Sequence, residues 1–218
     1  MRSFHLSHCG TLLALVVAAP GSLPAQYGHT PSFQVPRISD RDYNFAAADG
    51  GGTTLLFQWR EGTGARTHLV FDAGLTDPGG RADVRILLGG GFGYRVHSSN
   101  SEMPLDMVLT GGIGGSFGDG LSRLRIPFGL SVGHQFLLES PVSITPYAHP
   151  RIALDYCSRC GPRARGDADL ALDVDLGVEV AVSRQVALRA SFSLAGSDSF
   201  GSDDVFGVSL VWVPPGLR

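Results

Sequence analysis

The sequence predicts an all-β protein that folds as a single antiparallel up-and-down transmembrane β-barrel of eight to ten strands, with ten preferred. The clearest sign is the stretch 170–182, LALDVDLGVEVAV, in which aliphatic residues take every second position and small or acidic residues fill the gaps. A period of two belongs to a β-strand, and at about 3.3 Å per residue this strand would be roughly 40 Å long, enough for a tilted membrane crossing. Similar runs recur along the chain between turn sequences, which indicates repeated strands.

The first four expected strands cover residues 43–48, 53–60, 67–75 and 84–96. The first is weakly patterned, but the run Asp-Gly-Gly-Gly that closes it is typical of a hairpin turn. In the second and third, aromatic and aliphatic residues alternate with mostly polar ones, and Glu-Gly-Thr-Gly and Asp-Pro-Gly-Gly end the two runs. The fourth places mostly large apolar residues on one face and mainly Arg and Gly on the other.

The next three expected strands cover residues 105–117, 123–136 and 142–156. Each carries a largely apolar face opposed by a face of Gly, Ser, Thr, Arg or Asp, and Gly-Asp-Gly and Glu-Ser-Pro separate them. The last three are 170–182, 186–194 and 206–212, after which Pro214 and Pro215 prevent further pairing.

An even number of strands puts both ends of the barrel on the periplasmic side. With ten strands, the long links 157–167 and 196–203 fall on the outer side, as expected for bacterial barrels, whereas the long link 97–104 falls on the periplasmic side and breaks the rule. Eight strands remain the alternative, should the weak first segment and one neighbour not pair.

The chain divides into four expected parts: a signal peptide at 1–25, a periplasmic lead-in at 26–42, the β-barrel at 43–213 and a tail at 214–218. Arg2, a short apolar run and the break before Ala25 are the layout of a secretory signal, which predicts export. Removing this segment takes away one Arg and no acid, so the net charge changes from −3 to about −4, a balance that does not attract nucleic acid.

Charged residues on the faces opposite the apolar ones predict a lumen charge network. A soluble barrel could carry charge on its outer face, but the many glycines among these residues suit a narrow interior crowded with long side chains. We therefore expect ion pairs that largely plug the lumen, with a small pore as the alternative. The network comprises Arg85, Arg95, Arg123, Arg125, Arg151, Arg189, Asp72, Asp106, Asp155, Asp173, Asp175 and Glu179.

These features resemble the small outer-membrane β-barrel proteins of Gram-negative bacteria, of the OmpA and OmpX kind. The resemblance covers residues 43–213 and rests on the signal peptide, the alternating strands and the turn parity. It implies a place in the bacterial outer membrane and contact with membrane lipid and lipopolysaccharide. One departure is that the chain runs past Trp212 for six residues, whereas many such proteins end on an aromatic residue.

Cys157 and Cys160 form the one compact motif. In an exported protein two cysteines this close predict a disulfide that closes an outer loop, and neither a helix start nor a second pair of ligands supports a redox or metal site. The same loop is basic, since it contains Arg159, Arg163 and Arg165. These arginines either bind an anion or are simply exposed to solvent.

The sequence does not predict an enzyme. His134 and Ser131 are three residues apart in a strand and so point to opposite faces, and His149 is expected to be a hydrogen-bonded lumen residue. We expect no cofactor and no metal, and a monomer with a structural or surface-interaction role. A lipid-modifying enzyme and a secreted lipocalin-like binding barrel are the less favoured alternatives.

Overall fold

Alternating apolar and polar residues form long antiparallel strands in the computed structural model, which describes residues 30–50, 52–79, 83–118, 121–138, 140–158, 166–195 and 204–215. The expected signal peptide lies outside these residues. Within the described ranges the fold is all-β, and no helix is long and apolar enough to cross a membrane.

Ten strands of the described chain close the barrel, and an eleventh of two residues extends its rim. The preferred count of ten is therefore confirmed. The strands are β1 Arg41–Asp49, β2 Thr53–Gly64, β3 Thr67–Asp77, β4 Arg85–His97, β5 Asp106–Gly118, β6 Leu121–Gly133, β7 Phe136–Leu137, β8 Ser143–Cys157, β9 Asp167–Ala181, β10 Val186–Ala195 and β11 Val205–Trp212.

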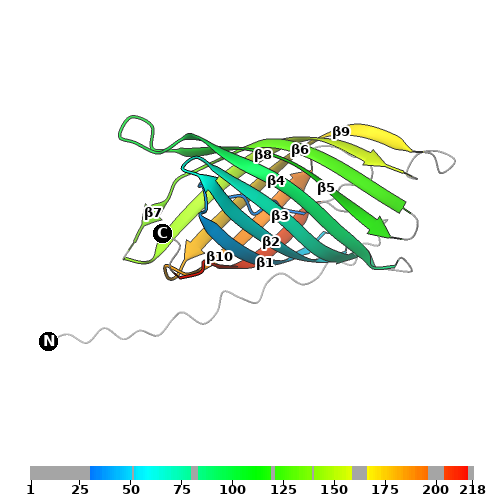
Figure 1. Cartoon of the computed structure of the whole chain (residues 1–218), viewed down its shortest axis with the longest axis horizontal. Helices are drawn as coiled ribbons and strands as arrows, with labels where there is room; N and C mark the ends of the chain where they lie inside the picture. The colour runs from blue at the N-terminus through cyan, green and yellow to red at the C-terminus, as the bar shows by residue number, and fades with distance from the viewer. Residues whose placement is uncertain are drawn as a thin grey trace.

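Each barrel strand pairs with its neighbours along the chain, and two pairings close the ring. The first joins β1 to β11, with Phe45 opposite Leu210, and the second joins β6 to β8, with Arg125 opposite Asp155. Figure 1 shows the strands tilted around an elongated barrel. We call the end where β1 begins and β11 finishes the terminal end, and the opposite end the loop end.

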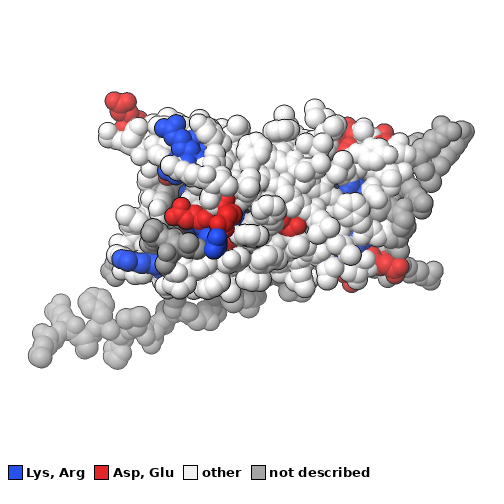
Figure 2. Space-filling model, viewed as in Figure 1, with Lys and Arg blue, Asp and Glu red and all other residues white. Residues whose placement is uncertain are grey.

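The outer face of the barrel is apolar and the inner face is charged. Phe71 and Leu172 are 47% and 54% exposed, whereas Asp175 and Arg189 on inward positions are 0% and 2% exposed. Figure 2 shows a wall that is largely uncharged, with most of the visible charge toward the two ends. A water-soluble barrel has the opposite arrangement, with apolar residues inside and charged residues on its outer surface.

Several strand limits differ from those expected. β1 begins at Arg41, two residues earlier than predicted, and the single strand predicted over 123–136 is divided into β6 and β7 by His134 and Gln135. β2 continues to Gly64, through the predicted turn, and β9 begins at Asp167, three residues earlier than predicted. The link between β4 and β5 protrudes at the terminal end, the same end as β7 (Figure 1), where the sequence placed it.

Candidate functional site in the barrel lumen

Residues 30–40, which precede β1, lie inside the barrel, and we call them the lumen segment. Phe33 and Val35 are 0% and 1% exposed. The carbonyl oxygen of Phe33 accepts hydrogen bonds from two buried guanidinium groups, Arg60 on β2 at 3.0 Å and Arg189 on β10 at 3.2 Å. Because these strands lie on the barrel wall, the segment fills part of the bore.

This placement corrects the expectation that residues 26–42 form a periplasmic lead-in. Residues 30–40 occupy the bore and residues 41–42 already belong to β1, while 26–29 lie outside the described residues. The lumen segment carries Pro31 and Pro36 and no regular period, so its sequence gives no sign of the wall it will pack against.

The backbone of Phe33 adopts a left-handed conformation, with φ of 49°. This region is unfavourable for a bulky residue and persists only where the surroundings hold it. Here the two arginines hold the carbonyl, and the ring packs in a buried cluster with Ala46 and Leu56. The lumen segment is thus fixed in one conformation by the wall.

Ion pairs fill the terminal half of the bore around the lumen segment. Arg60 lies 3.2 Å from Asp42, and Arg189 lies 2.7 Å from Glu179 and 3.7 Å from Asp42. The lumen segment adds Arg37, whose Nη2 donates at 3.0 Å to Oε2 of Glu179, the oxygen that also accepts from Arg189. Two buried acids therefore face two buried arginines and the partly exposed Arg37.

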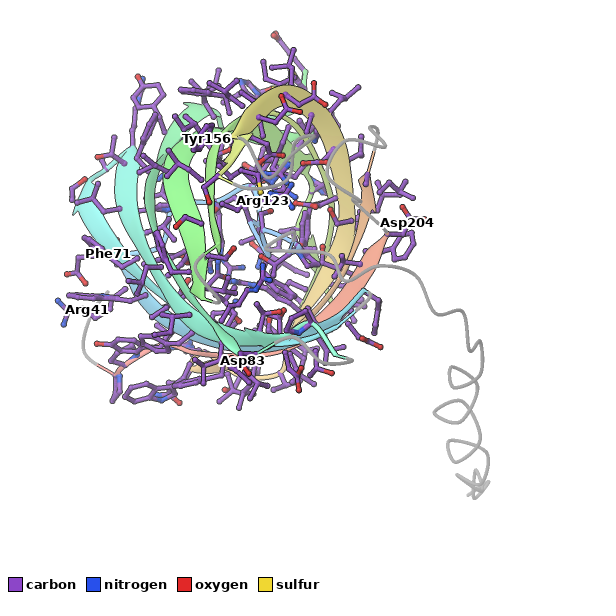
Figure 3. The ribbon with its side chains drawn as sticks, turned by 90° about the vertical axis from the view of Figure 1, so that its right-hand side faces the viewer. Arg41, Phe71, Asp83, Arg123, Tyr156 and Asp204 are labelled. Carbon is purple, nitrogen blue, oxygen red and sulfur yellow. The ribbon has the colours of Figure 1, made fainter. Side chains whose placement is uncertain are left out.

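A second group of ion pairs lies nearer the loop end, on β6, β8 and β9. Asp155 lies 3.1 Å from Arg123 and 3.5 Å from Arg125, and Arg125 also pairs with Asp173. Figure 3 looks along the bore from the loop end and shows Arg123 within it. Cross-strand pairing sets these contacts, since Arg125 faces Asp155 in the register.

The predicted lumen residues divide into those that the fold brings into these pairs and those that it does not. Arg123, Arg125, Arg151, Arg189, Asp155, Asp173, Asp175 and Glu179 are brought together. At the terminal end, Arg95 donates instead to the carbonyl oxygen of Ala65, and Asp106 accepts from the backbone of Ser99. Arg85 is buried at the loop end, and Asp72 lines a cavity described below.

Three network members escaped the sequence prediction: Arg37, Asp42 and Arg60. The first two were placed in the lead-in, which was expected to lie outside the barrel. Arg60 sits on the polar face of the strand predicted at 53–60, two positions after Gln58. The alternation of that strand was the one signal by which it could have been included.

His149 on β8 connects the lumen segment to the wall. Its Nδ1 lies 2.7 Å from Oγ of Ser32, and its Nε2 lies 2.8 Å from Oγ1 of Thr110 on β5. Oγ of Ser32 also donates to Asp175 at 2.7 Å, and Arg151 donates to the other oxygen of that carboxylate at 2.8 Å. Both ring nitrogens thus have hydrogen-bond partners, as expected for a residue that fixes structure.

A cavity of about 190 Å³ remains beside the lumen segment, against the wall formed by β3, β4, β5 and β6. The glycine-rich runs of β4 and β5 line it, because their inward glycines face each other: Gly89 lies opposite Gly114, and Gly91 opposite Gly112. Glycines at these positions leave the backbone bare and create the space.

Cys157 ends β8 and is fully buried. Its expected partner Cys160 and the loop arginines Arg159, Arg163 and Arg165 lie outside the described residues, so the disulfide and the anion contact stay predictions. Across the described part of the chain, no group of three His, Cys, Asp or Glu residues could hold a metal ion.

No protein-family model matches this chain, and no curated protein matches its sequence. One solved structure similar to it is a bacterial polysaccharide outer membrane secretin, with a TM-score of 0.49 and 10% sequence identity. The match covers 80% of this chain and 66% of that one, so the chain spans just under two thirds of its length. The similarity is distant.

Proposed function

We propose that this chain is an outer-membrane β-barrel with a structural or surface-interaction role, whose bore is closed by its own lumen segment and by buried ion pairs. The observation that carries the proposal is the inverted arrangement of the wall: large apolar side chains are exposed on all ten barrel strands, while the acids and arginines lie within.

A membrane explains this wall better than water does. Soluble monomers rarely expose contiguous apolar patches above a few hundred Å², whereas Phe45, Phe71, Ile113, Leu172 and Leu210 present apolar surface from strands all around the barrel. A closed barrel also satisfies its backbone hydrogen bonds between strands, as a bilayer demands. The small outer-membrane barrels that the sequence resembles share this design.

The contents of the bore support a closed barrel over a small pore. The buried carbonyl of Phe33 and the side chains of Ser32 and Arg37 bind groups on β2, β8, β9 and β10. A continuous water path would require the lumen segment to leave these partners and would break the hydrogen bonds that it makes with Arg60, Arg189, Glu179 and His149. A pore is therefore the second candidate.

In this proposal the chain is a monomer in contact with outer-membrane lipid and lipopolysaccharide, and it performs no catalytic step. An even number of strands puts the first and last strand ends on the periplasmic side. In this proposal the terminal end therefore faces the periplasm and the loop end faces the cell exterior.

The test is electrophoretic. The chain is expressed with its signal segment in a Gram-negative host, outer membranes and periplasm are separated, and heated and unheated samples of each are compared. A closed barrel has no free strand edge at which unfolding starts, so we expect a fast-migrating unheated band in the outer-membrane fraction alone. A periplasmic band without a heat shift would overturn the proposal.

A further inference from the structure

The 190 Å³ cavity lies to one side of the lumen segment, against β3, β4, β5 and β6. Inward positions on β8, β9 and β10, such as His149, Asp175 and Arg189, are 2% exposed or less because the lumen segment and the ion pairs pack against them. Inward positions on β3, β4 and β5, such as Asp72 and Gly112, are half-buried and border the 190 Å³ cavity.

Asp72 on β3 is the unusual side chain in this cavity. Every other carboxylate in the two groups of ion pairs lies within 4 Å of a guanidinium, but within the described ranges Asp72 has no such partner. Its Oδ1 is buried and accepts no hydrogen bond there. Among the described residues, the side chain that hydrogen-bonds to the carboxylate is that of Gln58, its cross-strand partner on β2.

Arg60, whose charge acts on Asp72, is already engaged elsewhere. Arg60 donates to Asp42, to the carbonyl oxygen of Phe33 and to Oε1 of Gln58. A carboxylate in such a place is costly unless a cation or several donors compensate it. The cavity beside Asp72 therefore offers room for a positive group that the described chain does not supply.

The chemistry of the lining favours an organic cation over the other classes of ligand. An anion would compete with carboxylates for the arginines of the cavity, which are paired as Arg123 with Asp155, Arg125 with Asp155 and Asp173, and Arg151 with Asp175. A metal ion would need further ligands, and no cluster of three suitable side chains exists in the part of the chain that the structure describes.

We infer that this cavity binds a compact organic cation, with an ammonium group at Asp72 and an apolar body against the bare glycine backbone of β4 and β5. The size agrees with such a ligand, because an apolar cavity of about 150 Å³ holds benzene and this one is about 190 Å³. Thr110 and Gln58 add polar groups to the same lining. The inference rests on the barrel fold and not on its membrane location.

The probe is benzylamine, titrated by calorimetry into the full mature chain folded in detergent, with folding checked by the heat shift. Benzyl alcohol and benzoate have nearly the same shape but are neutral and anionic. We expect saturable binding of benzylamine and at least about tenfold weaker binding of the other two. No saturation by about 10 mM, or equal binding of all three, would overturn the inference.

Two pairs of variants locate the site. Asp72→Asn keeps the shape and removes the charge, so benzylamine should bind at least about tenfold more weakly, whereas Asp49→Asn, at an exposed position, should bind it as the unchanged chain does. Unchanged binding by Asp72→Asn would contradict the assignment.

A second pair of variants tests the site if Asp72→Asn does not fold. Gly114→Leu fills the cavity, and its Cβ would meet its nearest atom, the carbonyl oxygen of Leu88, at an ordinary 3.5 Å. Ala47→Leu is the control: it adds bulk at an exposed position of β1 that does not line the cavity. We expect binding to be lost in the first and kept in the second; binding kept in both would overturn the inference.

Discussion

The ring of Phe33 occupies the space that a side chain at position 207 would need, since a Cβ built on Gly207 would lie 2.7 Å from Cζ of Phe33. Gly207 is on β11 and Phe33 is in the lumen segment, so this close approach joins the first described residues of the chain to its last strand. A substitution at Gly207 therefore tests where the lumen segment lies.

Gly207→Ala should lower the free energy of unfolding by about 1 to 3 kcal/mol, the usual cost of overpacking a buried site. Urea unfolding in detergent micelles measures the change. Gly114→Ala is the matched control, because it adds the same methyl group to an inward strand glycine that has room for it. Equal effects of the two variants would contradict the placement of Phe33.

The same contact predicts coupling between the two sites. In Phe33→Ala the ring is absent, so adding Gly207→Ala should then cost less than it does alone, with a coupling energy of about 0.5 to 3 kcal/mol in a double-mutant cycle. Additive effects would show that the ring lies elsewhere.

Arg189→Met should lower the free energy of unfolding by about 3 to 5 kcal/mol, because Glu179 loses its buried partner and keeps only the partly exposed Arg37, and the carbonyl of Phe33 loses a donor. The control is Arg41→Met, which removes the partly exposed pair with Glu61 at the terminal end and should change stability far less. Urea unfolding of both variants provides the comparison, and similar losses would mean that the lumen is hydrated.

Leu176→Arg tests the lipid-facing wall, since Leu176 lies in the middle of β9 and is 48% exposed. In a bilayer an arginine near the midplane should cost about 2 to 4 kcal/mol, whereas Val182→Arg, just past the terminal end of the strand, should cost about 0 to 1 kcal/mol. Folding equilibria in lipid vesicles measure both. A neutral result at Leu176 would contradict the orientation of β9.

The expected disulfide predicts that the mature chain resists thiol labelling until a reductant is added. Mass spectrometry of the alkylated, unfolded protein with and without reductant reads the result. Labelling of Cys157 and Cys160 without reductant would remove the pairing.

Much of the barrel could be predicted because each strand has one apolar face and one polar face. The alternation of apolar and polar residues therefore indicates which side chains point outward. Leu172 and Asp173 are adjacent in the sequence, and the structure places the first outside and the second inside. Strand ends were less certain: β1 reaches Arg41, which follows a stretch with two prolines and no period.

The lumen segment could not be predicted for a physical reason. Its partners are far away in the sequence, as with Ser32 and Asp175, which are 143 residues apart. Such contacts leave no local period in the lumen segment. For the same reason Asp42 and Arg37 were not recognised as members of the charge network, although Arg189 and Glu179, on adjacent long strands, were.

The most direct test of the closed barrel is its conductance in a planar lipid bilayer. The unchanged chain should insert without stable current steps, while the variant Ser32→Ala/Phe33→Ala/Arg37→Ala, which loses two side-chain anchors and the packed ring of the lumen segment, should show them. Stable steps from the unchanged chain, at the same level as from the variant, would contradict a bore closed by residues 30–40.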